Sequence, residues 1–239
     1  MSEILEIWKT KDAGIRSFLK TYPQLLDMLN GLIVVAKVPI SAAYDSDLTS
    51  EQAFLLQLWV AIYKYQEDSL FLIMSKRFDS GFALLRMAAE LARDIVRMSE
   101  DNVNYEMWQK KNELNREECY KQTFRFNQKN QIERFVFKQY NLFSNWGVHG
   151  HLTAISQREH VGETDDGRFA QIAIPEEAVV RNIGLWMASY LPLHQMCQKV
   201  FENAISRHSP EALTMLSKMI VVSGDVIKIT CKYGRGRKQ

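Results

Sequence analysis

The sequence has little of what marks disulfide-rich, turn-rich or membrane-spanning proteins. Its 239 residues include only 3 cysteines, 11 glycines and 5 prolines. The widely spaced Cys119, Cys197 and Cys231 make neither a disulfide framework nor a CxxC zinc site, and so little glycine and proline argues against disordered, collagen-like and turn-rich β classes. The longest purely apolar runs, such as 32–36 and 58–63, are far shorter than the roughly 20 residues of a membrane span. The acidic start of the sequence has no signal-peptide pattern, so we expect a cytoplasmic protein without a membrane partner.

Charge is equally unrevealing, because 30 basic residues oppose 28 acidic ones and leave a formal net charge of +2. That balance excludes a basic surface over the whole chain but leaves a local anion site open. Walker, GxGxxG, HExxH, GxSxG and EF-hand motifs are missing from the sequence. We therefore predict no metal, no nucleotide and no other cofactor.

Apolar residues recur at three- and four-residue steps through most of the chain, which predicts a mainly α protein. Pro23 suits the first turn of a helix, and Thr49 with Gln52 forms a capping box that should open another. We expect helices over 2–37 with a break near 21–23, 50–75, 79–98, 105–126, 131–147, 175–207 and 210–219, with a loop at 38–50. The apolar arc of 79–98 is wide, so this helix should lie centrally, and Pro192 should kink the helix over 175–207.

A different period appears after residue 150, where alternation over 154–160 and 169–174 predicts a β-hairpin. A further alternating stretch, 225–233, predicts a third strand, because a lone strand is not stable. The expected architecture is a single domain. It comprises N-terminal helices and a loop (1–50), a core bundle (51–149 and 175–220), a β appendage (152–174 and 225–233) and a basic tail (234–239).

Four charged residues, Arg86, Glu90, Arg93 and Arg97, follow steps of four, three and four and so share one stripe of the 79–98 helix. Two interpretations stand. The stripe is a solvated or internally paired face, or it is a polar seam inside the bundle that lines a site for an anionic ligand.

The segment 144–151 carries the other candidate site. His149 lies just beyond a helix end, where an imidazole can exchange a proton near neutral pH, and Asn145 one turn earlier can orient it. Alternatively, His149 caps the helix C-terminus. His149 and His151 have no acidic or cysteine partner at a ligand spacing, so a metal site is not expected. His160, His194 and His208 have no motif and are expected in structural or surface roles.

The basic tail adds Arg235, Arg237 and Lys238. These side chains can touch phosphates without sequence specificity, or they simply form a solubilising end.

The run Phe82-Ala83-Leu84-Leu85-Arg86-Met87-Ala88-Ala89-Glu90-Leu91, followed by Phe143-Ser144-Asn145-Trp146-Gly147-Val148-His149-Gly150, resembles bacterial all-α proteins related to the HEPN superfamily. The resemblance covers about residues 50–205. It implies a four- or five-helix bundle that dimerises, often as a metal-independent ribonuclease of defence systems with an Arg-x4–6-His motif. His149 would take the histidine position. The arginine positions here hold Leu142, Phe143 and Ser144, so the motif is degenerate.

Two functions follow as expectations. One is a non-catalytic, homodimeric or RNA-associated module of a defence or stress system, in which Arg86, Glu90 and His149 form an internal network. The alternative is an endoribonuclease with His149 as general acid and base, and with Arg86 or Arg93 holding the phosphate.

Overall fold

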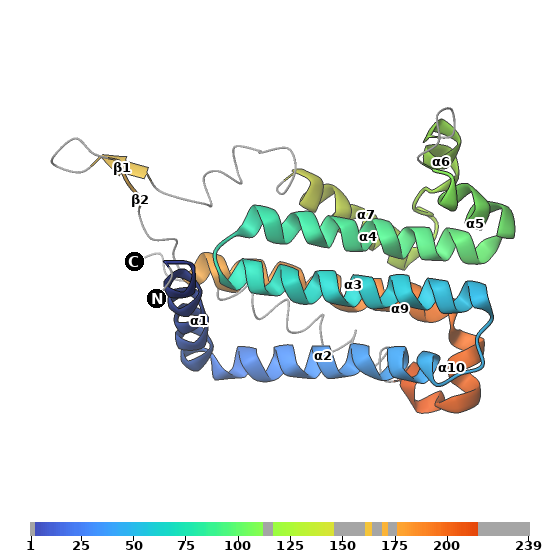
Figure 1. The fold of residues 1–239 in the computed structure, drawn as a ribbon, viewed down its shortest axis with the longest axis horizontal. Helices are drawn as coiled ribbons and strands as arrows, with labels where there is room; N and C mark the ends of the chain where they lie inside the picture. The colour runs from blue at the N-terminus through green and yellow to red at the C-terminus, as the bar shows by residue number, and fades with distance from the viewer. Residues whose placement is uncertain (1–2, 112–116, 146–160, 164–168, 172–175, 215–239) are drawn as a thin grey trace.

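The computed structural model describes residues 3–111, 117–145, 161–163, 169–171 and 176–214 (Figure 1). The described chain is mainly α, as predicted. Its helices are α1 (Glu3–Thr21), α2 (Pro23–Tyr44), α3 (Ser50–Met74), α4 (Phe78–Glu100), α5 (Asn102–Gln109), α6 (Glu117–Thr123), α7 (Gln131–Phe143), α9 (Glu176–Val200) and α10 (Glu202–His208), and its strands are β1 (Val161–Glu163) and β2 (Phe169–Gln171).

Long helices that lie side by side form the body of the molecule. α3 packs against α4 and α9, α4 also packs against α9, and α2 lies against α3 and α9. The capping box predicted at Thr49 and Gln52 is confirmed at the start of α3. The close approach of α3 and α4 depends on Gly81, since a Cβ there would lie 2.8 Å from Ile73 Cγ1. As the wide apolar arc predicted, α4 is central.

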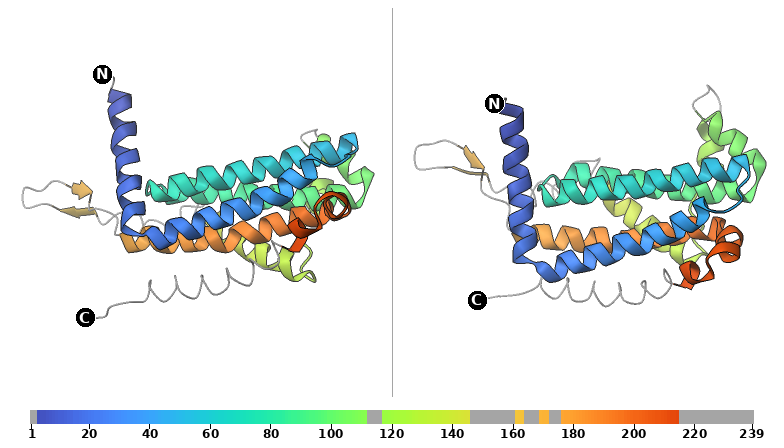
Figure 2. Two further views of the ribbon diagram at one scale, coloured as in Figure 1. Left: turned by 90° about the horizontal axis from the view of Figure 1, so that it is seen from below. Right: turned by 60° about the horizontal axis from the view of Figure 1, so that its bottom comes forward.

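The N-terminal helices break at Pro23, which occupies the first turn of α2 as predicted. α1 stands across the end of the bundle (Figure 2). The predicted end of the second helix at residue 37 is wrong, because α2 continues to Tyr44 and only 45–49 remain between α2 and α3. Pro39 gives up one helical hydrogen bond, but it is buried with Ala36 and Ala43, so packing holds the helix through it.

α2 is apolar as well as long. It is the one helix of the described part of the chain that could cross a membrane by length and composition, with a mean hydropathy of 1.6 in its most apolar window, 39% of which is buried in the protein. The core helix of a soluble protein passes the same test.

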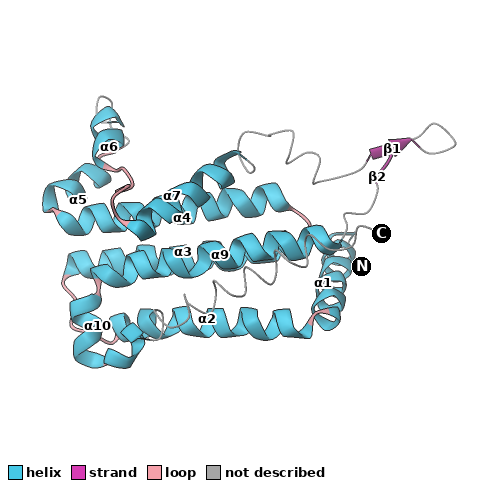
Figure 3. Ribbon diagram, turned by 180° about the vertical axis from the view of Figure 1, so that it is seen from behind, coloured by secondary structure: helices cyan, strands magenta, loops and turns pink. Residues whose placement is uncertain are grey.

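A shorter layer covers one side of α4. α7 packs on α4 and α9, while α5 and α6 continue from the far end of α4 (Figure 3). The single helical stretch predicted over 105–126 is wrong, since α5 and α6 are separate helices. The prediction of one helix over 175–207 is also wrong, because α9 ends at Val200 and α10 begins at Glu202. Pro192 lies inside α9.

β1 and β2 are three residues each and pair antiparallel, with Val161 opposite Gln171 and Glu163 opposite Phe169. The predicted strand over 154–160 and the predicted third strand over 225–233 lie outside the described residues. The sheet of three strands therefore stays a prediction.

Candidate functional site

The charged stripe of α4 faces the layer made by α5, α6 and α7. Its arginine side chains become less exposed along the helix: 27% for Arg86, 13% for Arg93 and 10% for Arg97. The stripe is therefore a seam between packed helices and not a solvated face. This charged seam comprises Arg86, Glu90, Arg93, Asp94, Arg97 and Glu133.

In the middle of the seam, the carboxylate of Asp94 accepts hydrogen bonds from three side chains, and Asp94 is only 2% exposed. Its Oδ1 accepts from Arg93 Nε at 2.9 Å and from Arg93 Nη2 at 2.6 Å. Its Oδ2 accepts from Trp108 Nε1 at 2.8 Å and from the Tyr120 hydroxyl at 2.7 Å. One carboxylate thus ties α4 to both α5 and α6.

Burial and charge act on these groups in different directions. Burial alone would lower the pKa of the Arg93 guanidinium, but the neighbouring Asp94 carboxylate outweighs it and the pKa is raised. Burial, and then the same carboxylate, raise the pKa of the Tyr120 phenol. Arg93 therefore stays charged and Tyr120 neutral at any physiological pH.

Glu133 plays the corresponding part at the end of the seam. It is 4% exposed and accepts from Arg97 Nη2 and, at 2.8 Å, from the backbone N–H of Asn127. Arg97 also bonds to Glu100 and donates from Nε to the Arg125 carbonyl at 2.9 Å. Asn130 caps α7 by accepting from the N–H groups of residues 132 and 133, which fixes the turn that carries Glu133.

Arg86 is held more loosely. Its Nε donates to Glu90 Oε1 at 3.1 Å within the helix, and its guanidinium lies 5.5 Å from the centroid of the Tyr140 ring on α7. One turn away, the rings of Phe82 and Phe143 stack with centroids 5.5 Å apart. Of the two arginines predicted to hold a phosphate, Arg86 and Arg93, Arg86 therefore lies nearer the end of α7.

The end of α7 leads toward the predicted histidine. Ser144 and Asn145 form a π-helical turn, a feature frequent at functional sites. Asn145 is exposed, and the Ser144 hydroxyl is buried with no hydrogen-bond partner among the described residues. His149 lies outside the described residues, as do Arg235, Arg237 and Lys238. The catalytic interpretation, which requires Arg86 to lie near His149, therefore stays a prediction.

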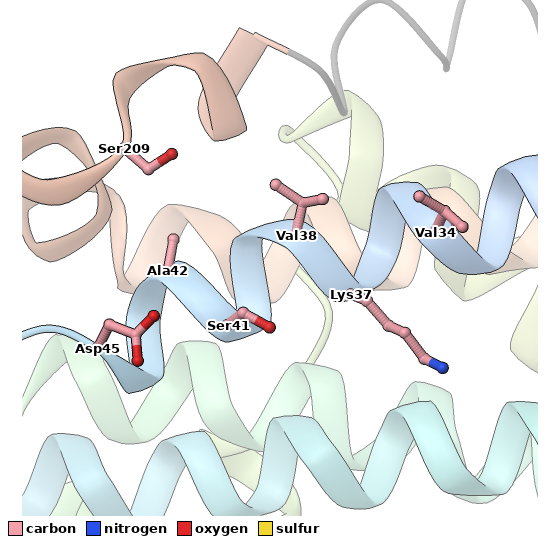
Figure 4. Close-up of a pocket in the computed structure, with 7 residues that line it drawn as sticks. All are labelled: Val34, Lys37, Val38, Ser41, Ala42, Asp45 and Ser209. Carbon is pink, nitrogen blue, oxygen red and sulfur yellow. The ribbon is translucent and has the colours of Figure 1, made fainter.

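A separate groove lies along α2 on the side of α10 (Figure 4). It encloses about 560 Å³ and is lined by Val34, Lys37, Val38, Ser41, Ala42, Asp45 and Ser209. Of the predicted site residues that the structure describes, none lines this groove. Among the described residues, no group of three or more histidine, cysteine, aspartate or glutamate side chains could hold a metal ion.

The sequence interpretation missed four residues: Asp94 and Glu133, which pair with the arginines of the seam, and Trp108 and Tyr120, which donate hydrogen bonds to Asp94. Two of them carried a signal. Asp94 interrupts the apolar arc of α4, and a lone acid there needs a partner. Glu133 follows Asn130 by three residues, the spacing at which a capping residue meets an acid in the first turn. Tyr120 and Trp108 lie on other helices, and spacing along α4 could not have found them.

Comparison with protein-family models, with curated proteins and with solved structures finds no match for this chain.

Proposed function

We propose that the protein is a non-catalytic, HEPN-like helical module of a bacterial defence or stress system that either forms a homodimer or associates with RNA. One observation carries the non-catalytic part. The two most buried arginines of the charged seam, Arg93 and Arg97, are both bound by carboxylates of the same chain.

A phosphate that entered the seam would have to displace these carboxylates. Asp94 is the residue next to Arg93 in the sequence and bonds to it, and it also accepts hydrogen bonds from Trp108 and Tyr120. Displacing it from Arg93 would leave a buried carboxylate without its counter-ion, which is strongly unfavourable. The same holds for Glu133, which binds a backbone N–H as well as Arg97. The middle of the seam is therefore better suited to fixing helices than to binding RNA.

A metal-independent endoribonuclease is the second candidate, and the exposure of Arg86 favours it. Arg86 keeps 27% of its side-chain surface exposed, and its one carboxylate neighbour, Glu90, is itself 33% exposed. A phosphate could displace Glu90 at lower cost than Asp94, since a partly exposed ion pair contributes less to stability than a buried one loses when it is broken. In this candidate Arg86 stabilises charge on the phosphate while His149 transfers the proton. Arg93 is no longer an equivalent choice, because Asp94 occupies it.

One assay separates the two. The purified protein is incubated with mixed RNA in EDTA, beside His149→Ala, Arg86→Ala and the control Arg16→Ala, which removes an exposed arginine of α1. The non-catalytic module predicts no cleavage by any of them, together with either RNA binding that weakens as salt rises or a dimer by light scattering. Cleavage that is lost in His149→Ala and Arg86→Ala but kept in Arg16→Ala establishes the ribonuclease. A monomer that binds no RNA would refute both proposals.

A further inference from the structure

A second polar region lies deeper in the bundle, along α9. Asn182, Trp186, Tyr190, His194 and Gln198 follow one another at four-residue steps, and each carries a polar group. The first four are 0% exposed and Gln198 is 7% exposed. A buried polar group requires a hydrogen-bond partner, so the polar side chain on each turn of this helix needs one.

Residues of α3 supply some of these hydrogen-bond partners. Trp59 Nε1 donates to His194 Nδ1 at 2.9 Å, and Trp186 Nε1 donates to the Gln66 carbonyl at 2.8 Å. Gln66 in turn donates from Nε2 to the Tyr190 carbonyl at 3.3 Å. These bonds join α3 and α9 over two helical turns.

The bond from Trp59 also sets the state of His194. Because Nδ1 accepts a hydrogen bond, the proton of the neutral ring lies on Nε2. Burial lowers the pKa of the imidazole to about 3, so the ring stays neutral at physiological pH. Its Nε2–H is a donor enclosed in the core.

Besides Asn182 Oδ1 and Gln198 Oε1 near the ends of this region, three atoms in its middle have no protein hydrogen-bond partner among the described residues: His194 Nε2, the Tyr190 hydroxyl and Gln66 Oε1. The first is a donor, the last is an acceptor and the hydroxyl can be both. We call these three residues the neutral cluster. Its unmet groups are complementary to one another, although no two of them bond directly.

The rings around these atoms lie close together. The centroids of Tyr190 and His194 are 4.8 Å apart with planes tilted by 56°, and the Tyr63 ring lies 6.2 Å from His194. The Tyr63 hydroxyl donates to the Glu67 carboxylate, and His194 Nε2 forms no hydrogen bond with the hydroxyl of Tyr63 or of Tyr190. Neither of these neighbours therefore supplies the missing partner for His194.

We propose that a water molecule bound between α3 and α9 accepts a hydrogen bond from His194 Nε2–H and bonds to the Tyr190 hydroxyl. Buried waters make about three hydrogen bonds to groups of this kind. A neutral ligand is required because an ion would lose its hydration beside an uncharged ring. The site shares no residue with the charged seam.

The proposed water can be tested by whether Tyr190→Phe lowers or raises the melting temperature, Tm. Removing a hydroxyl that bonds to a water destabilises the protein, whereas removing an unsatisfied buried hydroxyl is neutral or stabilising. We expect Tyr190→Phe to lower Tm by about 2–4 °C. Tyr63→Phe is the matched control, because it removes a hydroxyl with a known partner and should also lower Tm. An unchanged or higher Tm for Tyr190→Phe overturns the proposal.

A lower Tm for Tyr190→Phe could also arise if the Tyr190 hydroxyl bonded directly to a protein group. A crystal structure of the intact chain distinguishes these two causes. We expect a water within about 3.2 Å of both His194 Nε2 and the Tyr190 oxygen. Its loss in His194→Phe would agree with the proposal. A wild-type structure in which Tyr190 bonds to a protein group, with no water at His194, overturns the proposal even if Tyr190→Phe is destabilising.

Discussion

The charged seam and the neutral cluster are two solutions to the burial of polar groups within one bundle. The seam lies between α4 and the short helices, and its buried carboxylates accept hydrogen bonds from two guanidinium groups, an indole, a phenol and a backbone N–H. The cluster lies between α3 and α9 and contains no charge, but three of its polar atoms have no protein partner among the described residues. A charge cannot be buried unpaired, whereas a neutral group can be satisfied by water.

The two regions should therefore respond differently to the same kind of perturbation. Loss of one of the buried members of the seam, such as Asp94, leaves a buried charged group without its counterpart, and the cost is large. Loss of a group in the cluster changes a hydrogen bond at most. The cluster should instead respond to pH, since its histidine resists protonation.

Asp94→Ala should produce the largest loss of stability, because it strands the Arg93 guanidinium together with Trp108 Nε1 and the Tyr120 hydroxyl. We expect the free energy of unfolding to fall by about 3–5 kcal/mol, measured by urea denaturation with an unchanged m-value. Asp12→Ala is the matched control. It breaks the ion pair with Arg16, whose side chains are 73% and 57% exposed, and should cost less than about 1 kcal/mol. Equal losses for the two variants would contradict the description of the seam as a buried ionic network.

Acid should destabilise the neutral cluster through His194. Its pKa falls from an ordinary 6.5 in the unfolded chain to about 3 in the folded protein, so between these values the unfolded chain binds more protons. The contribution of His194 to stability is complete above pH 6.5 and is lost as the pH falls, by about 1.4 kcal/mol per pH unit.

The measurement is the free energy of unfolding from about pH 7 to about pH 4.5. His194→Gln is the comparison variant, because its amide oxygen can accept from Trp59 but does not titrate. We expect a flatter pH dependence for His194→Gln than for the wild type. Parallel curves would show that His194 is not buried in its neutral form.

Local patterns in the sequence predicted the helices well, because the signals for helices are themselves local. The capping box at Thr49 and the first-turn Pro23 are formed as expected. The end of α2 was misjudged because Pro39 breaks helices by local rules, whereas here it is buried in the core. The turn at Phe201, which separates α9 from α10, likewise carried no proline or glycine signal.

The candidate site was predicted only in part. Helical spacing correctly placed Arg86, Arg93 and Arg97 on one face, since that geometry is a property of a single helix. Whether the face was solvated depended on Tyr120 and Glu133, which belong to other helices. His194 shows the same limit, because it belongs to no sequence motif and its partner, Trp59, lies 135 residues away.

The smallest expected effect belongs to Arg86, where the seam opens toward the end of α7. Arg86→Met keeps an apolar side chain on the Tyr140 ring but removes the i,i+4 ion pair with Glu90. Because both charges are partly exposed, the free energy of unfolding should fall by less than about 1 kcal/mol. The difference from wild type should shrink in high salt, which screens exposed pairs. A loss as large as that of Asp94→Ala would mean that Arg86 stabilises the fold as strongly as the buried part of the seam does. Arg86 would then be no better suited than Arg93 to bind a phosphate.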